Sequence, residues 1–193
     1  LSATDAQEVR ITVPAGATAT VVDSADFLSV AVTLVLLQDA QAAFAGRLVL
    51  RDGQQAQRSI TVQCTGRGGS ATVEVSCHTQ GSSQFALTTI QNHAAPHTSS
   101  TVRILGVSAG SSRASVQSTI FIAPDVRDIA AHQVHKHLLL DAGARATSVP
   151  ALDILSDDVS CSHGAAITHL DTVQLFYLQA RGYGAEEARD AMV

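Results

Sequence analysis

The sequence predicts a mainly β protein that ends in a short helical segment. From residue 8 to about residue 160, short β-rich segments alternate with breaks containing Gly, Ser, Ala and Asp. No helical pattern separates these segments, which disfavours a doubly wound α/β sheet. Hydrophobic residues make up 46% of the 193 residues but aromatic residues only 4%, and such small or β-branched side chains suit thin, stacked strands. The length fits one domain with a substantial core.

Nine segments are expected to form strands. The alternation is clearest in ATVEVSC, where Ala71, Val73 and Val75 face one side and Glu74 faces the other. In chain order the segments are EVRITV (8–13), ATATVV (17–22), RLVLR (47–51), RSITVQC (58–64), ATVEVSC (71–77), TVRILGV (101–107), SVQSTIFI (115–122), HLLL (137–140) and ALDIL (151–155).

The breaks between the strands bear on the architecture. Small residues recur in PAGATA (14–19) and DAGARA (141–146), which favours a β-solenoid, because its coils must turn tightly and stack closely. The spacing of the segments is irregular, so the residues alone leave both a solenoid and a β-sandwich open.

The pattern changes at Asp171, where a helix is expected over DTVQLFYLQARG (171–182). Asp171 is a good N-cap with Gln174 three residues later, and Gly182 stands where a left-handed C-terminal residue belongs. An apolar stripe is formed by Val173, Phe176, Tyr177 and Ala180. A second helix is expected to begin in AEEARDAMV (185–193). We therefore divide the chain into a β domain (1–168) and the start of a truncated helical region (169–193).

Charge and cysteine content limit the partners and the compartment. The net charge is −5 without clustered Lys and Arg, so no nucleic-acid partner is expected. The longest apolar run, residues 27–37, is shorter than the roughly 20 residues that span a bilayer, so no membrane partner is expected either. The odd number of widely spaced cysteines does not suggest a disulfide framework, and we expect a reducing, cytoplasmic location.

Two cysteines and two histidines are possible sites. Cys64 and Cys77 lie in phase with the apolar faces of their strands and are expected to be buried, inert thiols. His93 and His97 bracket AAP, and Pro96 predicts a loop or a strand start there. A metal site at this pair is the alternative interpretation, although a zinc site would need three or four ligands.

A second group of histidines lies in HQVHKH (132–137). His135 and His137 would project from the same face of a strand, which makes them a further candidate metal pair. Without a third ligand in phase, the pattern favours polar residues on the surface.

The most informative pair is Cys161 and His163 in DDVSCSHGA (157–165). If this segment is extended, both side chains face the same way, with Cα atoms about 6.6 Å apart at about 3.3 Å per residue. A thiolate and an imidazole suit zinc, iron or an iron–sulfur cluster, but two ligands complete none of these sites. On spacing alone, a structural role is favoured. A hydrolase built on Ser162 or Cys161 is the least favoured class, because no base with an orienting group is visible.

These C-terminal motifs resemble the SufB/SufD family, the scaffold subunits of the Suf iron–sulfur cluster assembly machinery. The resemblance rests on Pro150, on the acidic-aliphatic strand at Asp153, on DDVSCSHGA (157–165) and on the helix with LFYLQARG (175–182). Upstream, HAAPHTSSTVRILGVSAG (93–110) and HLLLDAGARA (137–146) are similar to two further family segments. The match is specific from about residue 90 to residue 193 and looser back to residue 8.

The resemblance implies a right-handed parallel β-helix and a scaffold with no turnover of its own. It also implies pairing with a SufB-like or SufD-like subunit, as a hetero- or homodimer, and docking of a SufC-type ATPase. The docking helix would carry Asp171, Leu175, Phe176, Tyr177, Arg181 and Gly182. By resemblance, Cys161 and His163 are the cluster-assembly residues at a subunit junction. No stably bound cofactor is expected, only a transient iron ion or iron–sulfur cluster at the shared interface.

The CSHG motif makes the chain similar to SufD rather than to SufB. By resemblance, SufB instead carries a cysteine in the preceding coil, at the position of Ala144 here. The chain therefore lacks that thiolate, and cluster assembly is expected to require a SufB partner. The alternative is a divergent β-helix interaction module, in which Cys161 is buried and His163 bonds the backbone near Gly164.

Overall fold

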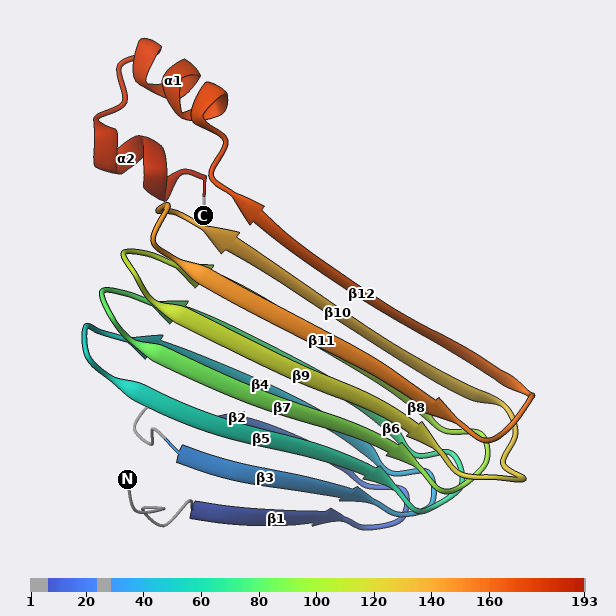
Figure 1. The fold of residues 1–193 in the computed structure, drawn as a ribbon. Coiled ribbons are helices and arrows are strands. Elements are labelled where there is room, and N and C mark those ends of the chain that lie inside the picture. Colours follow the sequence, from blue (N-terminus) through green and yellow to red (C-terminus); the bar gives the residue numbers. More distant parts are fainter. Residues whose placement is uncertain (1–6, 24–28, 193) are drawn as a thin grey trace.

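The chain folds into a β-helix of stacked coils that is followed by two short helices (Figure 1). The structure is a computed structural model that describes residues 7–23 and 29–192. The first six residues of the predicted β domain, the first two of the apolar run 27–37 and the last residue of the second predicted helix lie outside the described residues.

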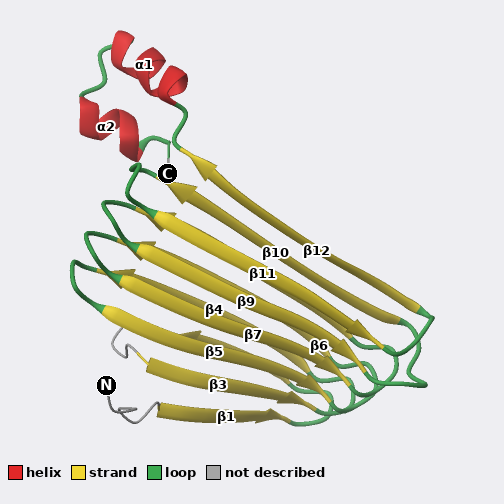
Figure 2. Ribbon diagram, in the orientation of Figure 1, coloured by secondary structure: helices red, strands yellow, loops and turns green. Residues whose placement is uncertain are grey.

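The strands form two parallel sheets that face each other (Figure 2). The first sheet, in spatial order, contains β1 (Gln7–Val13), β3 (Ser29–Leu36), β5 (Gln55–Cys64), β7 (Gln84–His93), β9 (Arg113–Ile122) and β11 (Arg145–Ile154). The second contains β2 (Thr18–Asp23), β4 (Gln41–Leu50), β6 (Ser70–Thr79), β8 (Ser99–Ser108), β10 (Ile129–Leu139) and β12 (Val159–His169).

Each coil contributes one strand to each sheet, and the coils wind in a right-handed sense. In Figure 1 the front strands run to the lower right and the rear strands run to the upper left, while the chain rises from β1 to β12. Equivalent positions in the middle coils are 29 residues apart, as Leu87 pairs with Val116. The expected right-handed parallel β-helix is therefore confirmed, and the sandwich is wrong.

The interior is built from inward side chains stacked in ladders along the axis. Burial alternates strictly in β6, where Val73, Val75 and Cys77 are buried and Glu74 is exposed, as the sequence predicts. Leu36 and Leu50 are fully buried, and each such side chain contributes about 1.5–3 kcal/mol to the free energy of folding.

Strands β3 and β7 were not predicted from the sequence, and β12 was considered only as a conditional extended segment around Cys161 and His163. Strand β7 carries polar side chains on its inward face, so it lacks the apolar alternation that marks the other strands. Its inward Thr89, Gln91 and His93 are nevertheless buried, and His93 stacks between Cys64 and Ile122 in one ladder. The parallel pairing of β7 with both neighbours fixes its place in the sheet despite this polar content.

The turns between coils stack on one another as closely as the strands do. Gly110 has φ +70°, and a Cβ atom added there would lie 3.0 Å from the backbone oxygen of Gly81 in the coil below. In the next coil, a Cβ atom at Gly143 would lie 2.7 Å from the backbone oxygen of Gly110. The small residues of DAGARA (141–146) thus permit close stacking, as the sequence predicts.

Two helices follow the last strand, α1 (Thr172–Ala180) and α2 (Ala185–Asp190). The carboxylate of Asp171 caps α1 by accepting hydrogen bonds from the backbone N–H groups of Val173 and Gln174, and Gly182 has φ +97°, so both predicted ends are confirmed. Helix α2 is joined to the β-helix through Arg189, which donates to the backbone oxygen of Leu140 and to the carboxylate of Asp141.

Gly110→Ala tests the stacking of the turns. It adds a side chain in the left-handed region and places its Cβ atom against the backbone of Gly81. Gly53→Ala is the matched control, because Gly53 has φ +75° but nothing within 4 Å of the added atom. We expect a loss of roughly 1–2 kcal/mol for Gly53→Ala, and a loss at least about 1 kcal/mol larger for Gly110→Ala, measured by urea unfolding. Equal losses would contradict the close contact between the turns.

Candidate functional site

Cys161 and His163 lie on β12, which is the last strand of its sheet. In the described part of the chain, no further strand pairs with the outer edge of β12 or of β11. The inward row of β12 continues the buried row of β10, since Cys161 pairs with Ala131 and His163 pairs with Gln133. In β10 this row is buried, whereas in β12 Cys161 is half-buried and His163 is exposed. The two residues therefore face the interior of a coil that is open at its end.

The thiol of Cys161 is partly enclosed by apolar neighbours. It packs against the buried cluster of Ile120, Ile122, Ile129 and Ala131. Burial raises the pKa of the Cys161 thiol, and a backbone hydrogen bond to Ala131 opposes this shift. At neutral pH the residue is thus held as a thiol, and metal binding would have to displace its proton.

The pair alone does not make a closed metal site. In residues 7–23 and 29–192, no three His, Cys, Asp or Glu side chains gather closely enough to hold a metal ion. Cys161 and His163 can supply at most two ligands, and the remaining ligands would have to come from another molecule.

A hydroxyl–imidazole pair lies on the outer face of β10 and β12. The Ser162 Oγ atom is 2.8 Å from Nδ1 of His132, a contact that the parallel pairing of β10 with β12 creates. This pair was not predicted from the sequence, because only the register brings these two residues, 30 positions apart, together. Among the described residues, no hydrogen bond or ion pair to an acidic side chain orients His132, so the arrangement of a hydrolase triad is incomplete there.

The prediction that His135 and His137 are surface residues is wrong. Both are buried, and Nε2 of His135 lies 3.3 Å from Nδ1 of His137. Their shared strand face is confirmed. Burial lowers the pKa of His135, and it lowers the pKa of His137 to about 4, with the neighbouring His135 lowering it further. Both rings are therefore neutral at pH 7.

His93 and His97 have separate surroundings. His93 is the last residue of β7, and both its ring nitrogens lie 2.7 Å from hydroxyls, Nδ1 from Thr98 and Nε2 from Ser100. Burial lowers the pKa of His93 to about 4. His97 lies in the following turn with φ +57°, and its Nδ1 is 2.7 Å from the carboxylate of Asp128. With both nitrogens of His93 engaged, this pair is explained by hydrogen bonding.

Cys64 and Cys77 are buried in the interior, as the sequence predicts, and burial raises the pKa of each thiol to about 12.

Helix α1 exposes its apolar stripe. None of its residues is buried, and Val173, Phe176 and Tyr177 are 73%, 70% and 55% exposed. The guanidinium of Arg181 lies 4.9 Å from the centre of the Tyr177 ring, while Leu175 is half-buried. Val173, Phe176 and Tyr177 thus form an apolar surface that no described part of the chain covers, and Phe176 and Tyr177 are two of the predicted docking residues.

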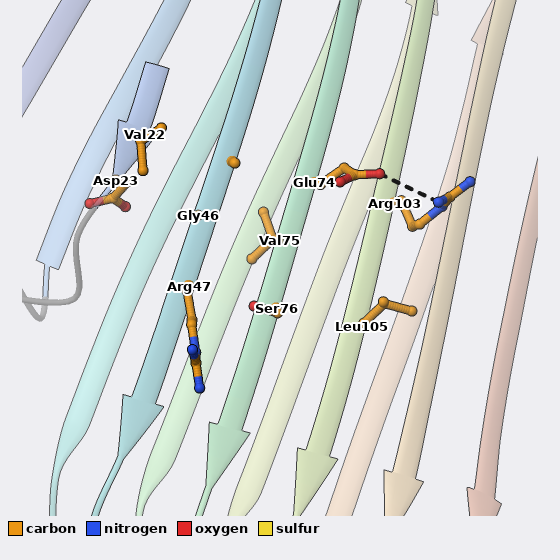
Figure 3. Close-up of a pocket in the computed structure, with 10 residues that line it drawn as sticks. Val22, Asp23, Gly46, Arg47, Glu74, Val75, Ser76, Arg103 and Leu105 are labelled. Carbon is orange, nitrogen blue, oxygen red and sulfur yellow. Dashed lines mark hydrogen bonds and ion pairs between the residues drawn. The ribbon is translucent and has the colours of Figure 1, made fainter. Parts of the chain in front are cut away.

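The outer face of the second sheet carries a hollow of about 300 Å³ (Figure 3). It crosses β2, β4, β6 and β8, so it lies among the earlier coils, away from Cys161 and His163. Glu74 and Arg103, both exposed, form an ion pair of 3.4 Å at its edge. The hollow is shallow and contains no buried polar group, so we do not assign it a role in the chemistry.

Comparisons with known proteins agree with the geometry. The family model described as "SUF system FeS cluster assembly, SufBD core domain" matches residues 2–193. An iron–sulfur cluster assembly SufBD family protein from Mycobacterium leprae is 32% identical over 206 residues, covering all of this chain and 52% of that protein.

Two further relatives match a shorter stretch. The protein ABCI7, chloroplastic, of Arabidopsis thaliana is 51% identical over 63 residues, which is 33% of this chain and 13% of that protein. The iron–sulfur cluster assembly protein SufD of Escherichia coli is 37% identical over 59 residues, which is 31% of this chain and 14% of that protein. The chain thus spans about half the length of the first of these relatives and matches a smaller part of the others.

No helix in the described residues is long and apolar enough to span a bilayer.

Thiol labelling tests the surroundings of the cysteines. We expect one of the three thiols to react with a disulfide reagent at pH 8 in the native protein, and Cys161→Ala to abolish that reaction. Cys64 and Cys77 should react only after unfolding, because their thiols are buried. If no thiol reacts in the native state, Cys161 is a structural residue, and if several react, the described interior is wrong.

The buried histidines predict a loss of stability in mild acid. His93 and His137 have pKa values near 4 when folded and near 6.5 when unfolded, so the unfolded chain binds protons first as the pH falls. The contribution of these two neutral rings to the free energy of unfolding is fully present above pH 6.5. About 3 kcal/mol of it per histidine is lost as the pH approaches 4. Urea midpoints between pH 7.5 and 4.5 measure this loss, and His137→Gln should flatten the profile. A wild-type urea midpoint that does not change with pH would contradict this expected loss of stability.

Proposed function

The chain belongs to the SufBD family of iron–sulfur cluster assembly proteins, and on this premise we propose that it is a SufD-like scaffold subunit. In this role it pairs with a SufB-like subunit, docks a SufC-type ATPase and has no turnover of its own. The iron ion or cluster is a transient substrate of the complex rather than a resident cofactor. A cytoplasmic location forms part of the proposal.

The observation that carries the proposal is the position of Cys161 and His163 at the open end of the β-helix. Their side chains face the interior row of the last coil, where a further coil would cover them. A partner subunit placed end to end against this coil would complete both the interior and the ligand set. Two ligands from this chain leave room for others from the partner, as a four-coordinate iron or cluster site requires.

The open end also offers apolar surface and unpaired backbone groups. Leu152 on β11 and Ile167 on β12 occupy inward positions but are 40% and 39% exposed. As edge strands, β11 and β12 each present a row of backbone groups that can pair with another chain. Pairing at this end would bury both the apolar side chains and the edges.

The SufB-like partner is expected to bring the thiolate that this chain lacks. The position at which SufB carries its cysteine, by resemblance, is Ala144 here, and Ala144 is fully buried. Its methyl side chain offers no ligand for iron. A homodimer would therefore hold only the Cys161 and His163 pairs, which favours the heterodimer for cluster assembly.

Helix α1 supports the docking of the ATPase subunit. Its exposed Phe176 and Tyr177 are large apolar side chains on one helix face, which is the arrangement that an apolar groove of a partner binds. The capped ends at Asp171 and Gly182 keep the helix formed before docking.

One observation favours the second candidate, a β-helix interaction module without a cluster role. Cys161 packs against the apolar cluster at Ile129 and Ala131, and burial raises the pKa of its thiol. Both features also suit a structural cysteine, so the reactivity of this thiol distinguishes the two functions.

Two sets of variants separate the two surfaces of the proposed scaffold. In a complex reconstituted with SufB- and SufC-type subunits, Cys161→Ala and His163→Ala should retain both partners but load less cluster, measured by visible absorbance and iron content. The double variant Phe176→Ala, Tyr177→Ala should lose the ATPase in co-purification and keep the SufB-type partner. Ser162→Ala, between the two site residues but on the outer face, is the matched control for loading. Unchanged loading in both site variants would show that the site assignment is wrong.

A further inference from the structure

The interior behind the open end contains a chain of buried polar groups. From the turn toward the last coil, its members are, in order, Ser112, Thr79, Ser108, His137 and His135. The hydroxyls of Thr79 and Ser108 are 2.7 Å apart, and Ser108 Oγ is 2.7 Å from Nε2 of His137. His137 Nδ1 in turn faces Nε2 of His135. This chain belongs neither to the apolar core nor to the pair at Cys161 and His163.

The direction of the hydrogen bonds follows from the group at the far end. Ser112 donates to the backbone oxygen of Thr79, which can only accept. The single proton of the Thr79 hydroxyl then goes to Ser112 Oγ, 3.0 Å away, or to the backbone oxygen of Val107, 3.5 Å away, and in both cases Thr79 accepts from Ser108. Ser108 accepts from His137 Nε2, and His137 Nδ1 accepts from His135 Nε2. The reverse direction leaves two contacts of Thr79 without a proton, one with Ser112 and one with Val107, whereas the first direction leaves only one. We therefore assign the first direction.

This assignment determines the state of the last ring. His135 is neutral, and its single proton is on Nε2, so its Nδ1 atom carries a lone pair. In the described residues, that buried Nδ1 atom has no hydrogen-bond partner. It is an acceptor that needs a donor.

Gln133 lies next to this acceptor and is unsatisfied as well. It is 4% exposed, and neither its Nε2 donor nor its Oε1 acceptor has a partner among the described residues. Gln133 faces inward two residues before His135, about 6.6 Å along the strand. On the neighbouring strand it pairs with His163, at a strand separation of about 4.8 Å. The unsatisfied atoms of His135 and Gln133 are an acceptor and then a donor and an acceptor, and the next residue in this order, the exposed His163, carries a ring N–H that can donate.

We propose that Gln133 is a positioning residue for His163. A turn of the Gln133 side chain would let Nε2 donate to Nδ1 of His135 and let Oε1 accept from one ring N–H of His163. The other ring nitrogen of His163 would then be free to bind iron. The structure does not contain these bonds, since both carboxamide atoms of Gln133 and Nδ1 of His135 lack partners among the described residues. The inference rests on the proposed function of His163 and extends it to a buried support. Cys161 has no such support, because its neighbour in the register is Ala131.

The physical consequence is a fixed tautomer. A histidine that binds a metal ion commonly donates its other N–H to a neighbouring acceptor, which fixes the ring orientation, and removal of that acceptor typically costs 10–100-fold in metal affinity. An exposed ring without a partner interconverts between its two tautomers. Here the acceptor would be held in place by hydrogen bonds that run back to the turn at Ser112.

The experiment compares Gln133→Met with the matched control Gln91→Met. Gln91 is another buried glutamine of the same interior, but its Nε2 donates to Ser100 Oγ, 2.7 Å away, and to the backbone oxygen of His132. The tautomer of His163 is read from its ring ¹⁵N shifts, assigned with His163→Ala. We expect one dominant tautomer in the wild type and in Gln91→Met, and a mixture in Gln133→Met. In His135→Leu, which removes the acceptor for Gln133, the ring of His163 should also change from one dominant tautomer toward the mixture.

Metal affinity supplies the second readout. Titration with Co²⁺ alone should show binding through His163 that weakens by about tenfold or more in Gln133→Met. In the His163→Ala background, Gln133→Met should cause no further loss.

If the wild-type ring already shows the tautomer mixture, or if Gln133→Met leaves the tautomer unchanged, the inference is overturned, even if Co²⁺ binds. If Co²⁺ does not bind through His163 while the tautomer is fixed by Gln133, the positioning holds and the metal role of His163 fails. Because the wild-type and His135→Leu spectra decide the question themselves, poor folding of Gln133→Met would not prevent the test.

Discussion

The parallel register between successive coils is the constraint on which the other features of the molecule depend. Each strand pairs residue by residue with the strand one coil below it, so an inward side chain always stands over another inward side chain. A slip of one residue would turn every side chain of that strand to the opposite face. The register thus forms the interior ladders, brings His132 to Ser162 and places Gln133 beside His163.

The same repetition creates the candidate site, because a β-helix does not close on itself. Every interior coil is covered by its neighbours, but the last coil presents its inward row to whatever lies beyond. The side chains of β12 are the continuation of a buried row, and yet His163 is exposed. A residue with interior surroundings on one side and an open face on the other suits a site that two subunits complete together. In the proposal above, Gln133 connects that open face to the interior hydrogen bonds behind it.

The sequence predicted the parts of this structure that follow a regular pattern. Alternation placed Cys64 and Cys77 in the interior, and cap residues placed both ends of α1. The resemblance, rather than periodicity, distinguished the β-helix from a sandwich. Strand β7 was missed because Thr89, Gln91 and His93 replace the apolar side chains of its inward face, and His135 and His137 were placed on the surface for the same reason. The partners of His93 and His137, namely Thr98, Ser100 and Ser108, come from other strands and turns, so no local pattern could show that these two rings are hydrogen-bonded when buried.

In the proposed function, the open coil formed by β11 and β12 is half of a site that a partner subunit completes. Hydrogen–deuterium exchange with and without a SufB-type partner can test for this half-site. We expect slower exchange at residues 145–154 and 159–169 in the complex, because a partner would cover the free edges of both strands. Strands β1 and β2 at the opposite end serve as the internal reference and should be unchanged. Protection at β1 and β2, with unchanged exchange at 159–169, would show that the partner does not bind at the open coil.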